Sequence, residues 1–114
     1  MTTKSCIHEY ATIGEARVAR RLVKAALDRE LLVSVNDGEE TTVSKAWRFK
    51  TIMDALCTTG EDILTLYAPT GDSMGTFWLI YGNADDGSEL ISDHTANDFC
   101  DRLCRIAYKE EQDA

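Results

Sequence analysis

The stretch from Thr51 to Asp101 contains no lysine and no arginine, although it carries ten of the twenty acidic residues of the chain. All twelve basic residues lie outside this stretch, and the formal net charge is −8. A surface of one charge sign attracts basic proteins and repels nucleic acid, whose binding depends on counterion release by lysine and arginine. The absence of basic residues therefore argues for a partner with a basic surface.

The chain also has little that would divide it into domains or place it in a membrane. It has one proline among 114 residues, and no repeat or Pro/Gly-rich linker. We therefore expect a single domain over residues 1–114, with loose ends at 1–10 and 109–114. Because no window is long and apolar enough for a transmembrane helix, and because the N-terminus lacks the apolar core of a signal peptide, we expect a cytoplasmic protein without a membrane partner.

The four cysteines lack the spacing of a disulfide framework or a zinc site: Cys6, Cys57, Cys100 and Cys104. Only the pair Asp93-His94, followed by Cys100 and Cys104, combines residue types that support metal or nucleophilic chemistry. The acidic neighbours there would raise the pKa of a thiol and disfavour a nucleophile. We therefore expect core cysteines, no metal, no cofactor and no enzymatic activity. An enzyme or metal protein centred on His94 stays a third alternative.

Glycine gives no support for nucleotide binding. No glycine-rich segment with GxGxxG or GKS/T spacing leads from a strand into a helix. The acidic stretch Gly82–Gly87 lacks the alternating ligands and flanking helices of a calcium-binding EF-hand. We interpret this stretch as a solvated hairpin turn.

Helical periodicity of the apolar residues predicts three helices. The first begins with capping-box spacing and should run from about Thr12 to about Arg29. The second should cover 49–56, with Gly60 in its C-terminal cap, and Thr95 should cap the third.

Two β-hairpins are predicted between these helices. The first spans 31–43 around an Asn-Asp-Gly turn. The second pairs 63–67 with 76–81, and its run Phe77–Ile80, including Trp78, is expected to form the central strand. With a short extended piece at 89–92, the order α-β-β-α-β-β-(β)-α predicts a two-layer α+β domain, in which three helices pack on an antiparallel sheet of four to five strands.

The first predicted helix carries a ridge of basic side chains: Arg17, Arg20, Arg21 and Lys24. Such a ridge can contact phosphates, so a small regulatory module that contacts nucleic acid is the main alternative function. The ridge is short, lacks interleaved aromatic residues and belongs to an acidic molecule. We favour a solvated helix face that offsets the acidic half within the domain or across a homodimer.

Three segments resemble a group of small, mostly uncharacterised proteins encoded by phages and prophages of proteobacteria: RRLVKAALDRELLVSVNDGEE, KTIMDALCTTGEDILTLY and GTFWLIYGNADDGSELISDHTAN. The similarity covers roughly residues 17–98. This chain departs from the group in an extra aspartate within 83–87 and in its basic first helix. The group has no agreed activity, and the resemblance implies a phage accessory protein. By analogy, such acidic proteins block host restriction, CRISPR or recombination complexes.

We therefore predict a non-catalytic interaction domain, a phage accessory protein that binds and inhibits a host nucleic-acid-handling or defence complex. Its acidic surface would act as a DNA mimic, as in an anti-CRISPR protein, because carboxylates can occupy a groove built for phosphates. The candidate contact residues are five acids and one aromatic residue: Asp72, Asp85, Asp86, Glu89, Asp93 and Trp47. Trp47 is either an interface anchor or a cap on the core. The plain alternative is an acidic surface that only confers solubility.

Overall fold

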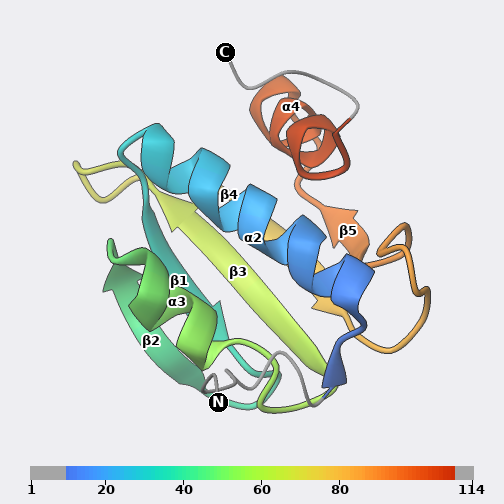
Figure 1. Ribbon diagram of the computed structural model, residues 1–114. Helices are drawn as coiled ribbons and strands as arrows, with labels where there is room; N and C mark the ends of the chain where they lie inside the picture. Colours follow the sequence, from blue (N-terminus) through green and yellow to red (C-terminus); the bar gives the residue numbers. More distant parts are fainter. Residues whose placement is uncertain (1–9, 110–114) are drawn as a thin grey trace.

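The structure is a computed structural model that describes residues 10–109, and Cys6 lies outside them. In this part of the chain, three helices cover one face of a five-stranded sheet (Figure 1). The helices are α2 (Ile13–Asp28), α3 (Phe49–Ala55) and α4 (Asp98–Ala107). The strands are β1 (Leu32–Asn36), β2 (Thr41–Ala46), β3 (Glu61–Tyr67), β4 (Ser73–Ile80) and β5 (Ile91–His94). Their order is β2-β1-β3-β4-β5 with antiparallel pairing throughout, which confirms the predicted two-layer α+β fold.

Side chains alternate along each strand between the two faces of the sheet. The described helices pack on one of these faces only (Figure 1). The buried face packs beneath the helices and carries six fully or almost fully buried apolar residues: Val33, Val35, Leu64, Leu66, Phe77 and Leu79. The opposite side, which we call the open face, carries five partly exposed residues outside the core: Leu32, Ile63, Tyr67, Trp78 and Ile80.

The predicted central position of Phe77–Ile80 is wrong, because β3 and not β4 is the middle strand. Leu79 is fully buried, whereas Trp78 is 37% exposed. The two residues are neighbours in one strand and therefore point to opposite faces of the sheet. A continuous apolar run resembles a strand buried on both faces, but the helices within residues 10–109 cover only one face.

The first helix follows its predicted signals closely. Thr12 is its N-cap, with both hydrogen bonds of the capping box present, and the helix ends at Asp28. Its buried stripe includes Val18, Leu22 and several alanines, whose small side chains let α2 lie close to the sheet.

Two predicted caps are wrong. Helix α3 ends at Ala55 with Leu56 as its C-cap, and the left-handed residue that follows is Cys57 (φ 69°) rather than Gly60. Helix α4 is capped by Asn97, whose side chain accepts a hydrogen bond from the Cys100 amide. Thr95 instead accepts a hydrogen bond from the Thr76 amide and so extends the pairing of β4 with β5.

Candidate protein-interaction surface

Three loops gather at one end of the sheet because all neighbouring strands are antiparallel. Asn36 at the end of β1 pairs with Ile63, so the turn 37–40 lies beside the start of β3. Glu61 pairs with Ile80 at the end of β4, so the β4–β5 loop (81–90) leaves from the same end. The connection 56–60 enters β3 there as well. None of these three loops contains lysine or arginine.

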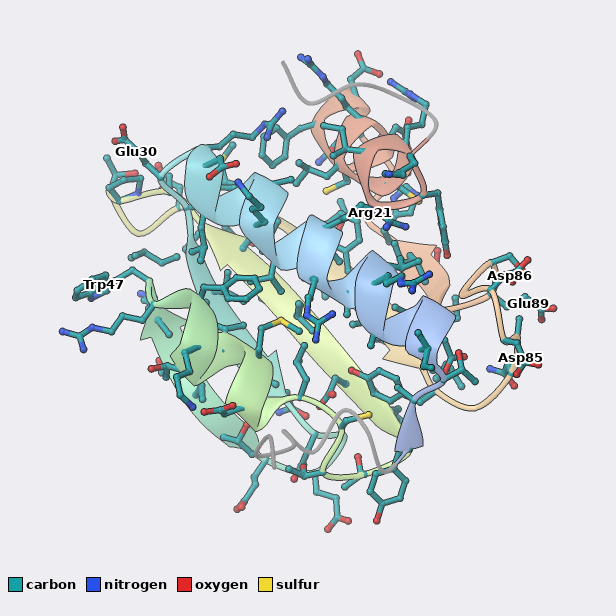
Figure 2. The ribbon with its side chains drawn as sticks, viewed as in Figure 1. Arg21, Glu30, Trp47, Asp85, Asp86 and Glu89 are labelled. Atoms are coloured by element: carbon teal, nitrogen blue, oxygen red, sulfur yellow. The ribbon has the colours of Figure 1, made fainter. Side chains whose placement is uncertain are left out.

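We call this region the acidic end, and it is defined by seven acidic residues: Asp37, Glu39, Glu40, Glu61, Asp85, Asp86 and Glu89. All except the half-buried Asp37 are exposed. Figure 2 shows Asp85, Asp86 and Glu89 projecting from the β4–β5 loop. Three members come from the β1–β2 turn, outside the stretch without basic residues. The fold thus extends the acidic surface that the sequence predicts.

A buried carboxylate, Glu15, anchors the β4–β5 loop. Its Oε1 accepts hydrogen bonds from the amides of Thr12 (2.9 Å) and Gly82 (2.8 Å). Its Oε2 accepts from the amides of Asn83 (3.0 Å) and Ala84 (3.5 Å). Burial by itself would raise the pKa of Glu15, but these backbone hydrogen bonds together lower it. Glu15 is therefore an ionised group that holds the loop through its backbone.

Two glycines bring the same loop against the first turn of α2. The Gly14 amide donates a hydrogen bond to the carbonyl oxygen of Asp85 (3.1 Å), and the Thr12 hydroxyl donates to that of Ala84 (2.9 Å). A Cβ atom at Gly14 would overlap the backbone of Asp85, and one at Gly87 would overlap the backbone of Gly14. Gly87 also has a positive φ of 80°. The acidic side chains of the loop are thus displayed from a backbone packed onto the helix.

Local hydrogen bonds keep two members of the acidic end ionised. The Asp86 carboxylate accepts from the Ser88 amide (2.9 Å), which lowers the pKa of Asp86. The Asp37 carboxylate accepts from the amides of Glu40 (3.0 Å) and Glu39 (2.9 Å), which lower the pKa of Asp37. At neutral pH these turns therefore present negative charge in defined positions.

Sequence reasoning missed a buried polar cluster beneath the acidic end. Asp62 is fully buried, and its Oδ2 accepts hydrogen bonds from the Tyr81 hydroxyl (2.6 Å) and the Cys57 amide (2.7 Å). Its Oδ1 has no hydrogen-bond partner among the described residues. Burial raises the pKa of Asp62 to about 6, against the opposing effect of those two hydrogen bonds. The alternation of β3 indicates this burial, because Asp62 lies two residues before Leu64 and therefore points to the same buried face.

The structure separates the remaining predicted contact residues from the acidic end. Asp72 precedes β4, whereas the acidic loop follows it, and an eight-residue strand is about 25 Å long. Asp93 pairs with Trp78 across β5 and β4 and so lies at the edge of the open face. Trp47 is 63% exposed at the corner between β2 and α3, with the Arg48 guanidinium 4.8 Å from its ring centroid. Only Asp85, Asp86 and Glu89 come together as predicted.

The basic ridge of α2 is partly occupied by contacts within the domain. Arg21 is half-buried, and its Nε donates a hydrogen bond to the carbonyl oxygen of Ala107 (2.6 Å) in α4. Lys24 forms an exposed ion pair with Asp28 (3.0 Å). Arg17 and Arg20 are exposed. The ridge thus offers fewer side chains for phosphate contact than its sequence suggests.

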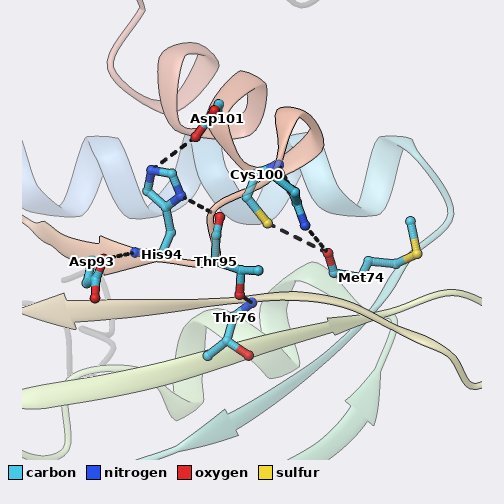
Figure 3. A network of polar contacts seen from close by, with 8 residues as sticks. Met74, Thr76, Asp93, His94, Thr95, Cys100 and Asp101 are labelled. Carbon is cyan, nitrogen blue, oxygen red and sulfur yellow. Dashed lines mark hydrogen bonds and ion pairs between the residues drawn. The ribbon is translucent and has the colours of Figure 1, made fainter.

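His94 lies in the packing of β5 against α4 (Figure 3). Its Nδ1 is 3.0 Å from the Thr95 carbonyl oxygen, and its Nε2 is 3.8 Å from Asp101 Oδ1. The Cys100 thiol contacts the Met74 carbonyl oxygen (3.7 Å), and burial raises the pKa of Cys100. Within residues 10–109, no group of three or more His, Cys, Asp or Glu side chains is placed to hold a metal ion.

Comparison with known proteins finds no matching family model, no similar curated protein and no similar solved structure. Over the described residues, no helix has the length and apolar character needed to cross a membrane.

Proposed function

We propose that this protein is a non-catalytic interaction domain that binds the basic surface of a partner protein through its acidic end. The observation that carries the proposal is the attachment of the β4–β5 loop to α2 by Glu15 and by the contact of Gly14 with Gly87. A loop held in place before binding loses less conformational entropy when it docks. Its carboxylates therefore act as a prepared binding surface.

Solubility alone would not require this arrangement. Exposed acids keep a protein soluble whether or not the loop that carries them is ordered. Here a fully buried carboxylate and two glycines in close backbone contact hold the loop, and ordering a loop has an entropic cost. The same contacts also join the sheet to α2, so charge variants are needed to separate binding from stability.

The partner class follows from the sign and location of the charge. Seven carboxylates at one end, with no lysine or arginine in the loops that carry most of them, match a groove lined by basic residues. Proteins that handle nucleic acids have such grooves for phosphates. In its most specific form, the proposal is a phage accessory protein that occupies a nucleic-acid groove of a host complex and inhibits it.

Affinity capture from a proteobacterial extract, followed by mass spectrometry, tests this proposal. The acidic-end variant Asp85→Asn/Asp86→Asn is compared with a control variant, Glu30→Gln/Asp72→Asn, which removes the same amount of charge. Figure 2 places Glu30 far from Asp85 and Asp86. We expect the wild type and the control to retain nucleic-acid-handling proteins that added duplex DNA releases, and the acidic-end variant to lose them. Equal retention by all three proteins would contradict the proposal.

A further inference from the structure

The open face of the sheet is a second surface, distinct from the acidic end. None of the described helices covers it, and its five apolar residues lie outside the core (Figure 1). Between the apolar positions lie small polar residues, including Ser34, Thr65 and Thr76. An amphipathic sheet face with exposed aromatic residues is typical of a protein contact.

The two sides of the open face, separated by β3, differ in shape and in charge. On one side of β3, a hollow of about 330 Å³ is lined by residues of β1, β2 and β3, among them Asn36, Lys45 and Tyr67. On the other side, Trp78 lies on β4 and is 37% exposed. The charges divide in the same way. Lys45 lies on the edge strand β2, with its Nζ 4.9 Å from the centroid of the Tyr67 ring, and Asp93 lies on the opposite edge strand β5.

We infer that the open face docks against the open face of a second copy of this chain, about a two-fold axis that runs parallel to β3. The strand order places β3 in the middle, with β1 and β4 on its two sides and β2 and β5 at the edges. Such an axis therefore sets β4 of one copy over β1 of the other, and β5 over β2.

This arrangement brings complementary features together. Trp78 of each copy enters the hollow over β1 of its partner, and 330 Å³ is within the size range of small-ligand sites, which gives room for an indole ring. Asp93 of each copy faces Lys45 of the other. Strand pairing sets Asp93 in one row with Trp78, Ile63 and Asn36. The Lys45 amide donates a hydrogen bond to Ser34, so Lys45 lies level with Ser34, two residues before Asn36 along β1. That offset is about 7 Å, which a lysine side chain can span.

Charge also distinguishes this axis from the other two-fold axis that lies in the interface. An axis perpendicular to the strands would set β2 over β2 and β5 over β5, so that Lys45 would face Lys45 and Asp93 would face Asp93. The parallel axis avoids both of these repulsions, and the like-charge contact that it creates is between Glu61 of the two copies, because β3 lies over β3. It also places the two acidic ends at the same end of the dimer.

The size of the face predicts a weak dimer. Five strands about 4.8 Å apart and a β3 strand about 23 Å long cover on the order of 500 Å² per copy. A total of about 1,000 Å² lies at the lower limit of specific interfaces, so we expect a dissociation constant in the micromolar range.

Sedimentation velocity on the intact chain, from about 1 µM to about 1 mM, tests the inference. We expect the wild type to change from monomer to dimer over this range. Lys45→Asp and Asp93→Lys should each weaken dimerisation by about tenfold or more, because each places like charges together. An equimolar mixture of the two variants should recover a 1:1 dimer, because both contacts between positions 45 and 93 then join opposite charges. A wild type that stays monomeric, or a mixture without recovery, would overturn the inference.

A pair of tryptophan variants gives an independent measurement. Trp78→Ser removes the residue that enters the hollow and should abolish the dimer, whereas Trp47→Ser removes a more exposed tryptophan at the corner between β2 and α3, outside the strands of the sheet, and should leave the dimer unchanged. Circular dichroism checks that each variant is folded. Should a charge variant not fold, the tryptophan pair decides alone, and dimerisation of Trp78→Ser at the wild-type level overturns the inference.

Discussion

The Gly14 amide donates a hydrogen bond to the carbonyl oxygen of Asp85 (3.1 Å), which joins the first turn of α2 to the acidic loop between β4 and β5. The two backbones approach so closely that neither Gly14 nor Gly87 has room for a Cβ atom. Stability and the display of acidic side chains therefore depend on the same contact, and the two effects must be measured separately.

The first prediction concerns the glycines. Gly14→Ala should lower the free energy of unfolding by about 1–3 kcal/mol, because the new methyl group forces the loop away from the helix. Gly60→Ala is the matched control, because a Cβ at Gly60 has no atom within 4 Å and should change stability little. Urea denaturation measures both, and equal stability of the two variants would show that the loop is not packed as described.

The second prediction concerns Glu15. Its folded-state pKa lies below the ordinary value of 4.5, so its contribution to stability is present above about pH 4.5 and is lost as the pH falls through the folded-state pKa. Glu15→Gln replaces an acceptor oxygen by an amide that faces backbone donors, and should lower the unfolding free energy at pH 7 by about 1–3 kcal/mol. The variant should also lose less stability than the wild type on acidification. Parallel pH profiles for the two proteins would be inconsistent with a lowered pKa.

The third prediction concerns Asp62, whose pKa is raised, so that its effect on stability changes with pH in the opposite direction to that of Glu15. The pKa of Asp62 is about 6 in the folded protein against an ordinary value of 3.8, so the folded state binds the additional proton. Stability from this group is therefore full below about pH 4 and is lost as the pH rises through about 6, by on the order of 3 kcal/mol at most. Asp62→Asn keeps an acceptor for Tyr81 and Cys57 without the charge.

We expect Asp62→Asn to be more stable than the wild type at pH 8, and the difference to shrink toward pH 5. Denaturant titrations at both pH values measure this difference directly, and other titrating groups cancel in the comparison. A difference between the two proteins that does not change from pH 8 to pH 5 would show that the pKa of Asp62 is not raised.

The fourth prediction distinguishes the two faces of the sheet. Leu79→Ala removes a fully buried side chain and should lower the unfolding free energy by about 2–5 kcal/mol. Trp78→Ala, at the adjacent position on the open face, should have a smaller effect because Trp78 is 37% exposed and its removal leaves no enclosed cavity. The measurement is made at low protein concentration, so that dimer formation does not contribute. The reverse order of the two effects would mean that the open face is covered.

Much of the fold could be predicted because its signals are local. Thr12 and Glu15 have capping-box spacing, alternating apolar residues define β1, and a β-branched and aromatic run defines β3. The cap at Asn97 was missed because threonine and asparagine are both favoured N-cap residues, and the left-handed Cys57 could not be predicted because no local preference selects it. The orientation of Trp78 was missed because a fully apolar run does not reveal which face of the sheet is covered.

The candidate surface was less predictable because it depends on strand pairing. Asp72 and Asp85 lie in one acidic stretch of sequence, but β4 separates them by its whole length. Conversely, Glu39 and Glu40 are distant from Asp85 in sequence and reach the same end of the sheet through the register of β1 with β3. Charge composition therefore predicted the sign of the surface but only three of its seven members.

The most direct test of the acidic end as a binding surface is the association rate with a captured partner, measured for the acidic-end variant Asp85→Asn/Asp86→Asn beside the charge-matched control Glu30→Gln/Asp72→Asn. Exposed charges contribute little to stability, so both variants should fold like the wild type. The acidic-end variant should associate about tenfold or more slowly at low salt and show a weaker salt dependence, while the control stays close to the wild type. Association of the acidic-end variant at the wild-type rate, with the wild-type salt dependence, would contradict the account and leave the charge with a role in solubility alone.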